Sequence, residues 1–221
     1  MDIFTLILLI ATGTHILKSR DRKSRIVFLA MHLGRYPIER LMQTLIEGYA
    51  RALGEPDAQR QAQIFKLLTT TELELCEQFN RFAEEFARAD AVSARVSKLT
   101  FDLPYAGRFF PTATFDLRRA MTIHAQAIAD ATAVTATTLG DLSDAAAALK
   151  LSKSRAFTIS AELLLLQHTC HWFCRSKMIA SARLLARHNT SYTQVLAAVS
   201  PDTRSAYLAL TAPRRTSGQQ P

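Results

Sequence analysis

PIERLMQTLIEGYARALG, residues 37–54, is the stretch with the clearest hydrophobic period in the chain. Its apolar side chains recur at spacings of three and four, which is the period of one face of an α-helix. Pro37 suits a first helical turn, and Gly54 followed by Pro56 marks a helix end. The stretch therefore predicts an amphipathic helix whose buried face comprises Ile38, Leu41, Met42, Leu45, Ile46, Tyr49, Ala52 and Leu53.

The same period recurs on the C-terminal side of this stretch. Residues 57–86 repeat apolar side chains at spacings of three and four. Thr71 and Glu74 have the spacing of a capping box, which leaves open whether this segment is one helix or two. Residues 117–128 form another amphipathic pattern, which fades into the Ala- and Thr-rich residues 129–148. We expect that last stretch to be partly a linker.

The C-terminal third of the chain predicts one long helix and two short ones. From about Ser154 to His188 the sequence is broadly apolar in its first half, so this element is expected to be the central helix of the fold. Short helices are expected around residues 192–199 and 201–210. Ser200 and Pro201 give the second of these an N-cap and a first-turn signal.

Composition places the chain among all-α proteins. Its 221 residues are 48% hydrophobic and 21% charged, with only 7 Gly and 7 Pro, so it has material for a core and few residues that break long helices. We predict a bundle of long amphipathic helices with an N-terminal apolar helix and no strand-bearing catalytic scaffold. The predicted organisation is an apolar helix with a basic juxtamembrane patch (residues 1–25), a helical bundle domain (26–212) and a disordered tail (213–221).

The N-terminus begins with an uncharged, mainly apolar run from Ile3 to Leu17. As a helix it would rise about 22 Å, which is short of the roughly 30 Å of a bilayer's hydrocarbon core. Asp2 stands where a secretory signal would carry positive charge, so cleavage is not expected. The run is either a short membrane anchor or a core helix with a solvated basic end. The basic patch that follows it comprises Lys18, Arg20, Arg22, Lys23 and Arg25.

The net charge of +8 is unevenly distributed. Residues 18–25 hold five basic side chains against Asp21 and so carry half of the excess. Such a patch attracts anionic headgroups, and the positive-inside rule would put it on the cytoplasmic side of a membrane. An anionic membrane surface is therefore expected as a partner ahead of nucleic acid. Residues 55–90 are net acidic, and we predict that an acidic helix over 72–90 lies beside a basic helix over 175–187.

A proline-broken, aromatic-rich loop is expected over residues 99–116. Loops that carry apolar side chains often serve interfaces, which makes this one a candidate contact loop. The interpretation that we favour is that its rings pin a long connection onto the bundle. The candidate contact residues are Tyr105, Phe109 and Phe110.

Imidazoles and thiols cluster over residues 167–174, where a helix would place four of them on about half of its circumference. These side chains suit zinc, but one helix rarely closes a tetrahedral site and no metal-binding spacing is present. We therefore expect no metal or cofactor, and small polar side chains filling a helix interface instead. An odd number of cysteines also indicates a reducing compartment. The metal candidates are His168, His171, Cys174 and Cys170, with Cys76 or His124 as more distant ones.

Residues 142–155 have the spacing of a helix-turn-helix, with Lys150, Lys153 and Arg155 placed to meet phosphates. Against this, Lys150 occupies the place of the usual turn glycine, and the second helix runs into the most apolar part of the chain. A helix that reads DNA needs an exposed face.

No nucleophile elbow, glycine-rich phosphate loop, zinc-protease motif or di-iron pair occurs in the sequence, and no small-molecule substrate is indicated. The hypothesis that we adopt is a non-enzymatic interaction or accessory protein at the cytoplasmic face of a membrane, with a protein partner. Two alternatives remain open. One is a basic DNA-binding regulator acting through residues 142–155, and the other is a metal-dependent helical enzyme.

Overall fold

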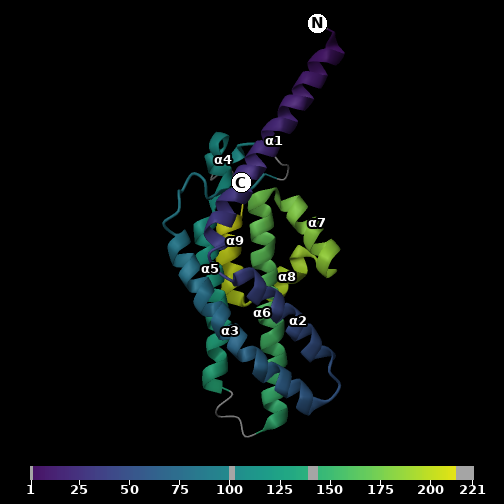
Figure 1. Cartoon of the computed structure of the whole chain (residues 1–221), viewed down its shortest axis with the longest axis vertical. Helices are drawn as coiled ribbons and strands as arrows, with labels where there is room; N and C mark the ends of the chain where they lie inside the picture. The colour runs from purple at the N-terminus through teal and green to yellow at the C-terminus, as the bar shows by residue number, and fades with distance from the viewer. Residues whose placement is uncertain (1, 100–102, 139–143, 213–221) are drawn as a thin grey trace, which may run out of the picture.

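The computed structural model describes residues 2–99, 103–138 and 144–212, and it confirms the all-α fold class (Figure 1). Helices dominate the described residues, with a single two-stranded ribbon among them. The predicted tail, 213–221, lies outside these residues. The elements in chain order are α1 Ile3–Leu33, α2 Ile38–Gly54, α3 Ala58–Phe86, β1 Arg95–Ser97, α4 Ala106–Phe109, the 3-10 turn η1 Pro111–Ala113, β2 Thr114–Asp116, α5 Leu117–Thr138, α6 Ala145–Cys174, α7 Lys177–His188, α8 Tyr192–Ala198 and α9 Pro201–Thr211.

The main hydrophobic core lies between α2, α3, α5 and α6. The helix predicted from residues 37–54 is confirmed, and its predicted face is the one that is buried. Residues 58–86 form one helix, α3, which runs unbroken through Thr71. Asp57 caps its start by accepting a hydrogen bond from the Arg60 N–H at 2.8 Å. Its apolar stripe then packs without interruption against α2 and α5.

A second, smaller core lies between α6 and the C-terminal helices, with Leu165, Leu184 and Tyr207 at its centre. The short helices α8 and α9 are confirmed close to their predicted positions. Ser200 caps α9 by accepting a hydrogen bond from the Thr203 N–H at 3.1 Å, and Pro201 occupies the first turn. The α6 helix belongs to both cores, so it is the central helix of the fold.

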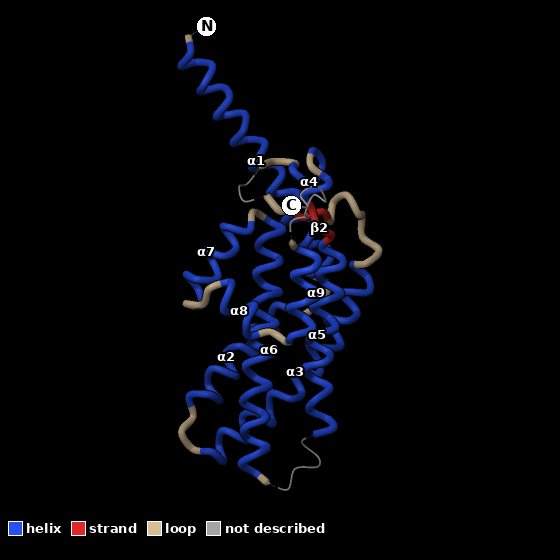
Figure 2. Tube along the Cα trace, turned by 180° about the vertical axis from the view of Figure 1, so that it is seen from behind, coloured by secondary structure: helices blue, strands red, loops and turns tan. Residues whose placement is uncertain are grey.

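Two predictions about the C-terminal half are wrong. Residues 154–188 are two helices, because the chain turns at Arg175 and Ser176 starts α7 by accepting a hydrogen bond from the Ile179 N–H. The predicted contact between an acidic helix over 72–90 and a basic helix over 175–187 is also wrong. The basic segment forms α7, which packs on α6 and α8. Both views place α6 between α3 and α7 (Figures 1 and 2). The helical part of α5 also extends to Thr138, well into the stretch expected as a linker.

A buried ion pair joins α3 to α6. The Arg155 Nη2 lies 3.2 Å from the Glu72 Oε2, and both side chains are almost fully buried. The Tyr49 hydroxyl donates to the Glu72 Oε1 at 2.6 Å, so α2 is tied to the same carboxylate. Burial raises the pKa of Tyr49 above its ordinary value, with the charge of Glu72 as the next cause. The tyrosine therefore remains a donor.

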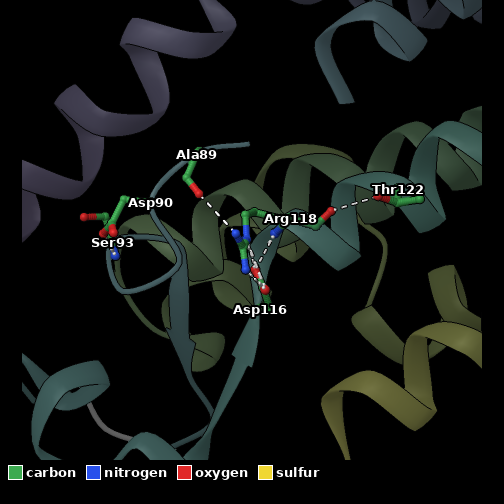
Figure 3. Close-up of polar contacts among 6 residues, drawn as sticks. All are labelled: Ala89, Asp90, Ser93, Asp116, Arg118 and Thr122. Carbon is green, nitrogen blue, oxygen red and sulfur yellow. Dashed lines mark hydrogen bonds and ion pairs between the residues drawn. The ribbon is translucent and has the colours of Figure 1, made fainter. Parts of the chain in front are cut away.

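The connection between α3 and α5 is a folded ribbon rather than an open loop. β1 pairs antiparallel with β2, and Val96 lies opposite Phe115. Arg118 closes the connection, as Figure 3 shows: its guanidinium donates to the Ala89 carbonyl at 3.1 Å and to the Asp116 carboxylate at 2.7 Å. The Asp90 carboxylate accepts from the Ser93 N–H at 2.7 Å in the same turn.

Two buried histidines, His124 and His168, make hydrogen bonds inside the bundle. The His124 Nε2 lies 3.1 Å from the Thr169 Oγ1, which lies 2.9 Å from the Tyr207 hydroxyl. Burial, with the nearby His168 as the next cause, lowers the pKa of His124 to about 3. Burial also lowers the pKa of His168 to about 3, with Lys177 and His171 as further causes. Both imidazoles are therefore neutral in the folded protein at neutral pH.

We predict that the free energy of unfolding falls as the pH drops below about 6.5, because the unfolded chain then binds protons that folded His124 and His168 do not. The expected slope is roughly 1.4 kcal/mol per pH unit for each histidine. Urea unfolding between about pH 7 and pH 4 measures it. The substitution His124→Gln should make the slope shallower, since one of the histidines whose pKa is lowered by burial is lost. An unchanged slope in this variant would contradict the assignment.

Candidate functional site

The feature that stands out in the structure is the exposed N-terminal half of α1. This helix projects from one end of the bundle, and its N-terminus is the point farthest from the body in both views (Figures 1 and 2). By length and composition it is the one helix among the described residues that is long and apolar enough to cross a membrane. The exposed large apolar side chains of its N-terminal half are Ile3, Phe4, Leu6, Ile7, Leu8, Leu9, Ile10, Ile16 and Leu17.

The structure corrects the predicted length of this element. The helix does not end at Leu17, because α1 is continuous for 31 residues to Leu33, across the predicted boundary at residue 25. Its uncharged part, Ile3 to Leu17, rises about 22 Å at about 1.5 Å per residue. With Lys18 and Arg20, which can reach toward the headgroups, the rise is about 27 Å, against the roughly 30 Å of hydrocarbon in a bilayer. The alternative of a core helix is also wrong for residues 3–17, none of which is buried.

The C-terminal half of α1 fixes the projecting half to the bundle. The Phe28 ring packs against Phe86 and Phe173, with ring centroids 5.8 and 5.9 Å apart, and Leu29 is buried in the main core. These contacts are made with α3 and α6, two helices of the main core. The direction in which α1 leaves the body is therefore set by packing.

Arg25 forms the joint between α1 and the body. Its Nη1 donates to the Arg95 and Phe173 carbonyls, each at 3.2 Å, and its Nε donates to the Asp21 Oδ2 at 3.2 Å. The side chain is only 15% exposed. Arg25 was predicted as part of the basic, membrane-facing patch, and this is wrong because its guanidinium turns inward to satisfy carbonyls.

The rest of the basic patch lies around the base of the projecting half. Arg20 and Lys23 are exposed, whereas Lys18 and Arg22 are half-buried. These four residues keep the basic charge at the level where the helix meets the bundle. We call them, together with the exposed Arg108 of α4, the basic collar.

The α4 turn lies at the same end of the molecule, beside α1 (Figure 1). The Asp21 Oδ2 accepts from the Tyr105 N–H at 3.2 Å, which pins the start of α4 to α1. Tyr105 is in the left-handed region, with φ of 55°, a backbone conformation that is uncommon for a non-glycine residue and that this hydrogen bond helps to hold. Gly107 lies against Arg25 and Arg95, where a Cβ would come within 3.3 Å of the Arg95 Cβ. Sequence reasoning assigned no role to Asp21, although it is the one acid in a basic run.

The aromatic loop divides into two parts. Phe115 pins the connection as predicted, since it is buried and its ring lies 4.9 Å from that of Trp172. Phe109 and Phe110 do not pin the loop onto the bundle, because their side chains are 71% and 46% exposed at the tip of α4. Two large apolar side chains therefore stand in solvent beside the base of α1. Tyr105 is half-buried and serves the joint.

The imidazole and thiol candidates do not converge on a common point. Among residues 2–99, 103–138 and 144–212, no group of three or more His, Cys, Asp or Glu side chains could hold a metal ion. His168 is fully buried, with its Nε2 3.0 Å from the Ser181 Oγ. Burial raises the pKa of the Cys170 thiol to about 12 and also raises the pKa of Cys174. His171 lines a groove on the α7 side.

The predicted helix-turn-helix lacks its turn. Residue 142 lies outside the described residues, and from Ala145 onward α6 runs without a break through Lys150 and Lys153. Arg155, predicted to meet phosphate, is instead buried against Glu72. The predicted recognition helix therefore has no free N-terminus, and the predicted helix-turn-helix is wrong.

Comparison of the chain with protein-family models, with curated proteins and with solved structures gives no significant match. The function is therefore inferred from the residues and their arrangement alone. They bring together an exposed apolar helix, a basic collar and an aromatic tip at one end of a helical bundle.

Proposed function

We propose that the protein is a membrane-anchored helical protein whose bundle acts as a non-enzymatic interaction or accessory module on the cytoplasmic side. The observation that carries the proposal is the projecting half of α1, whose large apolar side chains are all exposed and would otherwise stand in water. Burying each such side chain contributes about 1.5–3 kcal/mol, so a lipid environment would stabilise this arrangement strongly.

The pattern of apolar residues on α1 favours lipid over a protein partner as its environment. A helix that packs against another helix typically carries one apolar stripe, whereas a helix surrounded by lipid is apolar on all sides. Residues 3–11 are apolar all round apart from Thr5. The Thr14 hydroxyl donates to the Ala11 carbonyl at 2.9 Å, which satisfies it within the helix.

The basic collar supports the proposed orientation. Positive charge that directly follows an apolar span favours the cytoplasmic side of the membrane. Lys18, Arg20 and Lys23 would then meet anionic headgroups, at about 1 kcal/mol each. Since the bundle follows the basic residues of α1 in the chain, it would lie in the cytoplasm.

Flotation with vesicles that contain anionic lipid tests this proposal. The full chain is expected to float with the vesicles, whereas a chain that begins at Lys18 is expected to stay in the soluble fraction. The shorter chain keeps Asp21 and Arg25, so the joint with the bundle is retained. Circular dichroism of both chains checks that the bundle is folded. If the full chain stays in the soluble fraction, or if both chains float equally, the anchor proposal fails.

The aromatic tip of α4 is proposed as a second, shallower membrane contact. We predict that Phe109→Ser with Phe110→Ser lowers the partition coefficient of the full chain into vesicles by about tenfold or more, because each inserted ring contributes about 1 kcal/mol or more. Equilibrium binding to vesicles measures it. Phe157→Ser is the control, since Phe157 is 61% exposed on α6 and lies about 24 Å along that helix from Phe173, the contact of Arg25. If Phe157→Ser lowers the partition coefficient equally, the rings at the tip of α4 make no specific contact with the membrane.

A further inference from the structure

A groove between α6 and α7 lies on a part of the body that the membrane proposal does not use. It has a volume of about 330 Å³. Gln167 and His171 of α6 form one wall, and α7 supplies the other with two arginines. Leu184, which is buried in the smaller core, and the exposed Ala186 complete its lining.

The charges around this groove are unbalanced. Arg183 and Arg187 lie four residues apart on α7, so their side chains leave the same face of the helix. None of the ion pairs within residues 2–99, 103–138 and 144–212 involves either of them. By contrast, Arg25, Arg118 and Arg155 each have a carboxylate partner.

The His171 imidazole is close enough to these arginines for their charge to affect its pKa. Burial lowers its pKa, and the positive charges of Arg183, Arg187 and His188 lower it further. The imidazole is therefore neutral at neutral pH and can donate a hydrogen bond into the groove. Gln167 is oriented by His188, whose Nε2 lies 3.0 Å from the Gln167 Oε1. The amide nitrogen of Gln167 remains as a donor.

We propose that this groove binds the phosphate group of a small phosphorylated compound or of a lipid headgroup. Two guanidinium groups offer paired donors in the geometry that phosphate oxygens accept, and a neutral imidazole and an amide add further donors. The volume lies at the lower end of the range for small-molecule sites, about 300–1,000 Å³. Leu184 and Ala186, the two apolar residues of the lining, would contact the carbon part of such a ligand. The proposal is independent of the anchor, because it involves only α6 and α7.

Titration of the full chain with inorganic phosphate tests the proposal, with NMR of the His171 imidazole and calorimetry as the two readouts. The signal of His171 is assigned by its loss in His171→Gln. Bound phosphate is expected to raise the pKa of His171, since an anion stabilises the imidazolium. Removal of one guanidinium, in Arg183→Gln or Arg187→Gln, is expected to weaken binding by about tenfold or more.

The double variant Arg51→Gln with Arg119→Gln is the matched control, because it removes two exposed arginines from α2 and α5. Binding in the control should equal that of the unaltered chain. Vesicles with and without phosphatidic acid separate the two ligand sources: a response of His171 only to the acidic vesicles assigns the groove to a headgroup, and a response to free phosphate assigns it to a soluble compound. No change in His171 with either probe, or equal weakening in the control, would overturn the proposal.

Discussion

Leu8→Asp combined with Leu9→Asp is expected to release the protein from membranes. Both leucines are exposed on the projecting half of α1 and would lie in hydrocarbon if the helix inserts. A charged side chain at the centre of a membrane helix costs about 2.5–3.5 kcal/mol on the insertion scale, so two would weaken insertion by about three orders of magnitude or more. Flotation of the double variant beside the unaltered chain measures the loss.

The matched control places the same charges on the body. Leu67 and Leu73 are 76% and 56% exposed on α3, away from the base of α1. Leu67→Asp with Leu73→Asp should leave flotation unchanged, because these side chains face water in the proposed orientation. If the two double variants behave alike, the exposed leucines of α1 have no special affinity for lipid.

Arg155→Met is expected to destabilise the fold by about 3–5 kcal/mol, because it leaves the buried Glu72 carboxylate without its cationic partner. The loss should appear as a lower urea midpoint with an unchanged slope. Tyr49 would still donate to Glu72, but a neutral donor does not offset a buried charge. The three helices joined at this carboxylate, α2, α3 and α6, would be loosened together.

The control for this prediction is an ion pair of the same type at the surface. Arg81 and Glu77 lie 2.5 Å apart on α3, and both are mostly exposed. Arg81→Met should cost about 0.5 kcal/mol or less, since water already solvates both charges. Equal costs for the two arginine variants would mean that burial of the Glu72 pair contributes nothing.

The parts of the fold that could be predicted from the sequence are those where one helix face packs on the core. Residues 38–54 illustrate this, because only the core-facing positions are apolar, and the period therefore marks both the helix and its buried side. The break at Ser176 had a weaker signal. An N-cap serine was present, but no glycine or proline accompanied it, and the apolar pattern continues across the break.

The candidate site was predictable in its composition but not in its geometry. The apolar run and the basic patch are contiguous in the sequence, so they could be found together. Arg25 could not be separated from its basic neighbours, because its partners are the carbonyls of Arg95 and Phe173, which only the fold brings near. The same holds for the exposed ring of Phe109, which lies on the α4 turn that the hydrogen bond from the Tyr105 N–H to Asp21 ties to α1.

The joint at Arg25 has a consequence for the proposed function. A flexible linker would let the bundle turn freely relative to its anchor, whereas α1 is one continuous helix whose C-terminal half packs in the main core. The same end of the bundle would then always face the bilayer. An interacting protein would approach the opposite end or the sides.

The depth of individual residues in a bilayer tests the central claim, that the projecting half of α1 lies in the membrane. Tryptophan introduced as Leu9→Trp, Phe109→Trp or Leu67→Trp is measured with lipids brominated along the acyl chain, while the buried native Trp172 gives a constant background. Deep bromines are expected to quench Leu9→Trp, shallow bromines to quench Phe109→Trp, and neither to quench Leu67→Trp. Unquenched emission from Leu9→Trp in protein bound to vesicles would contradict the claim.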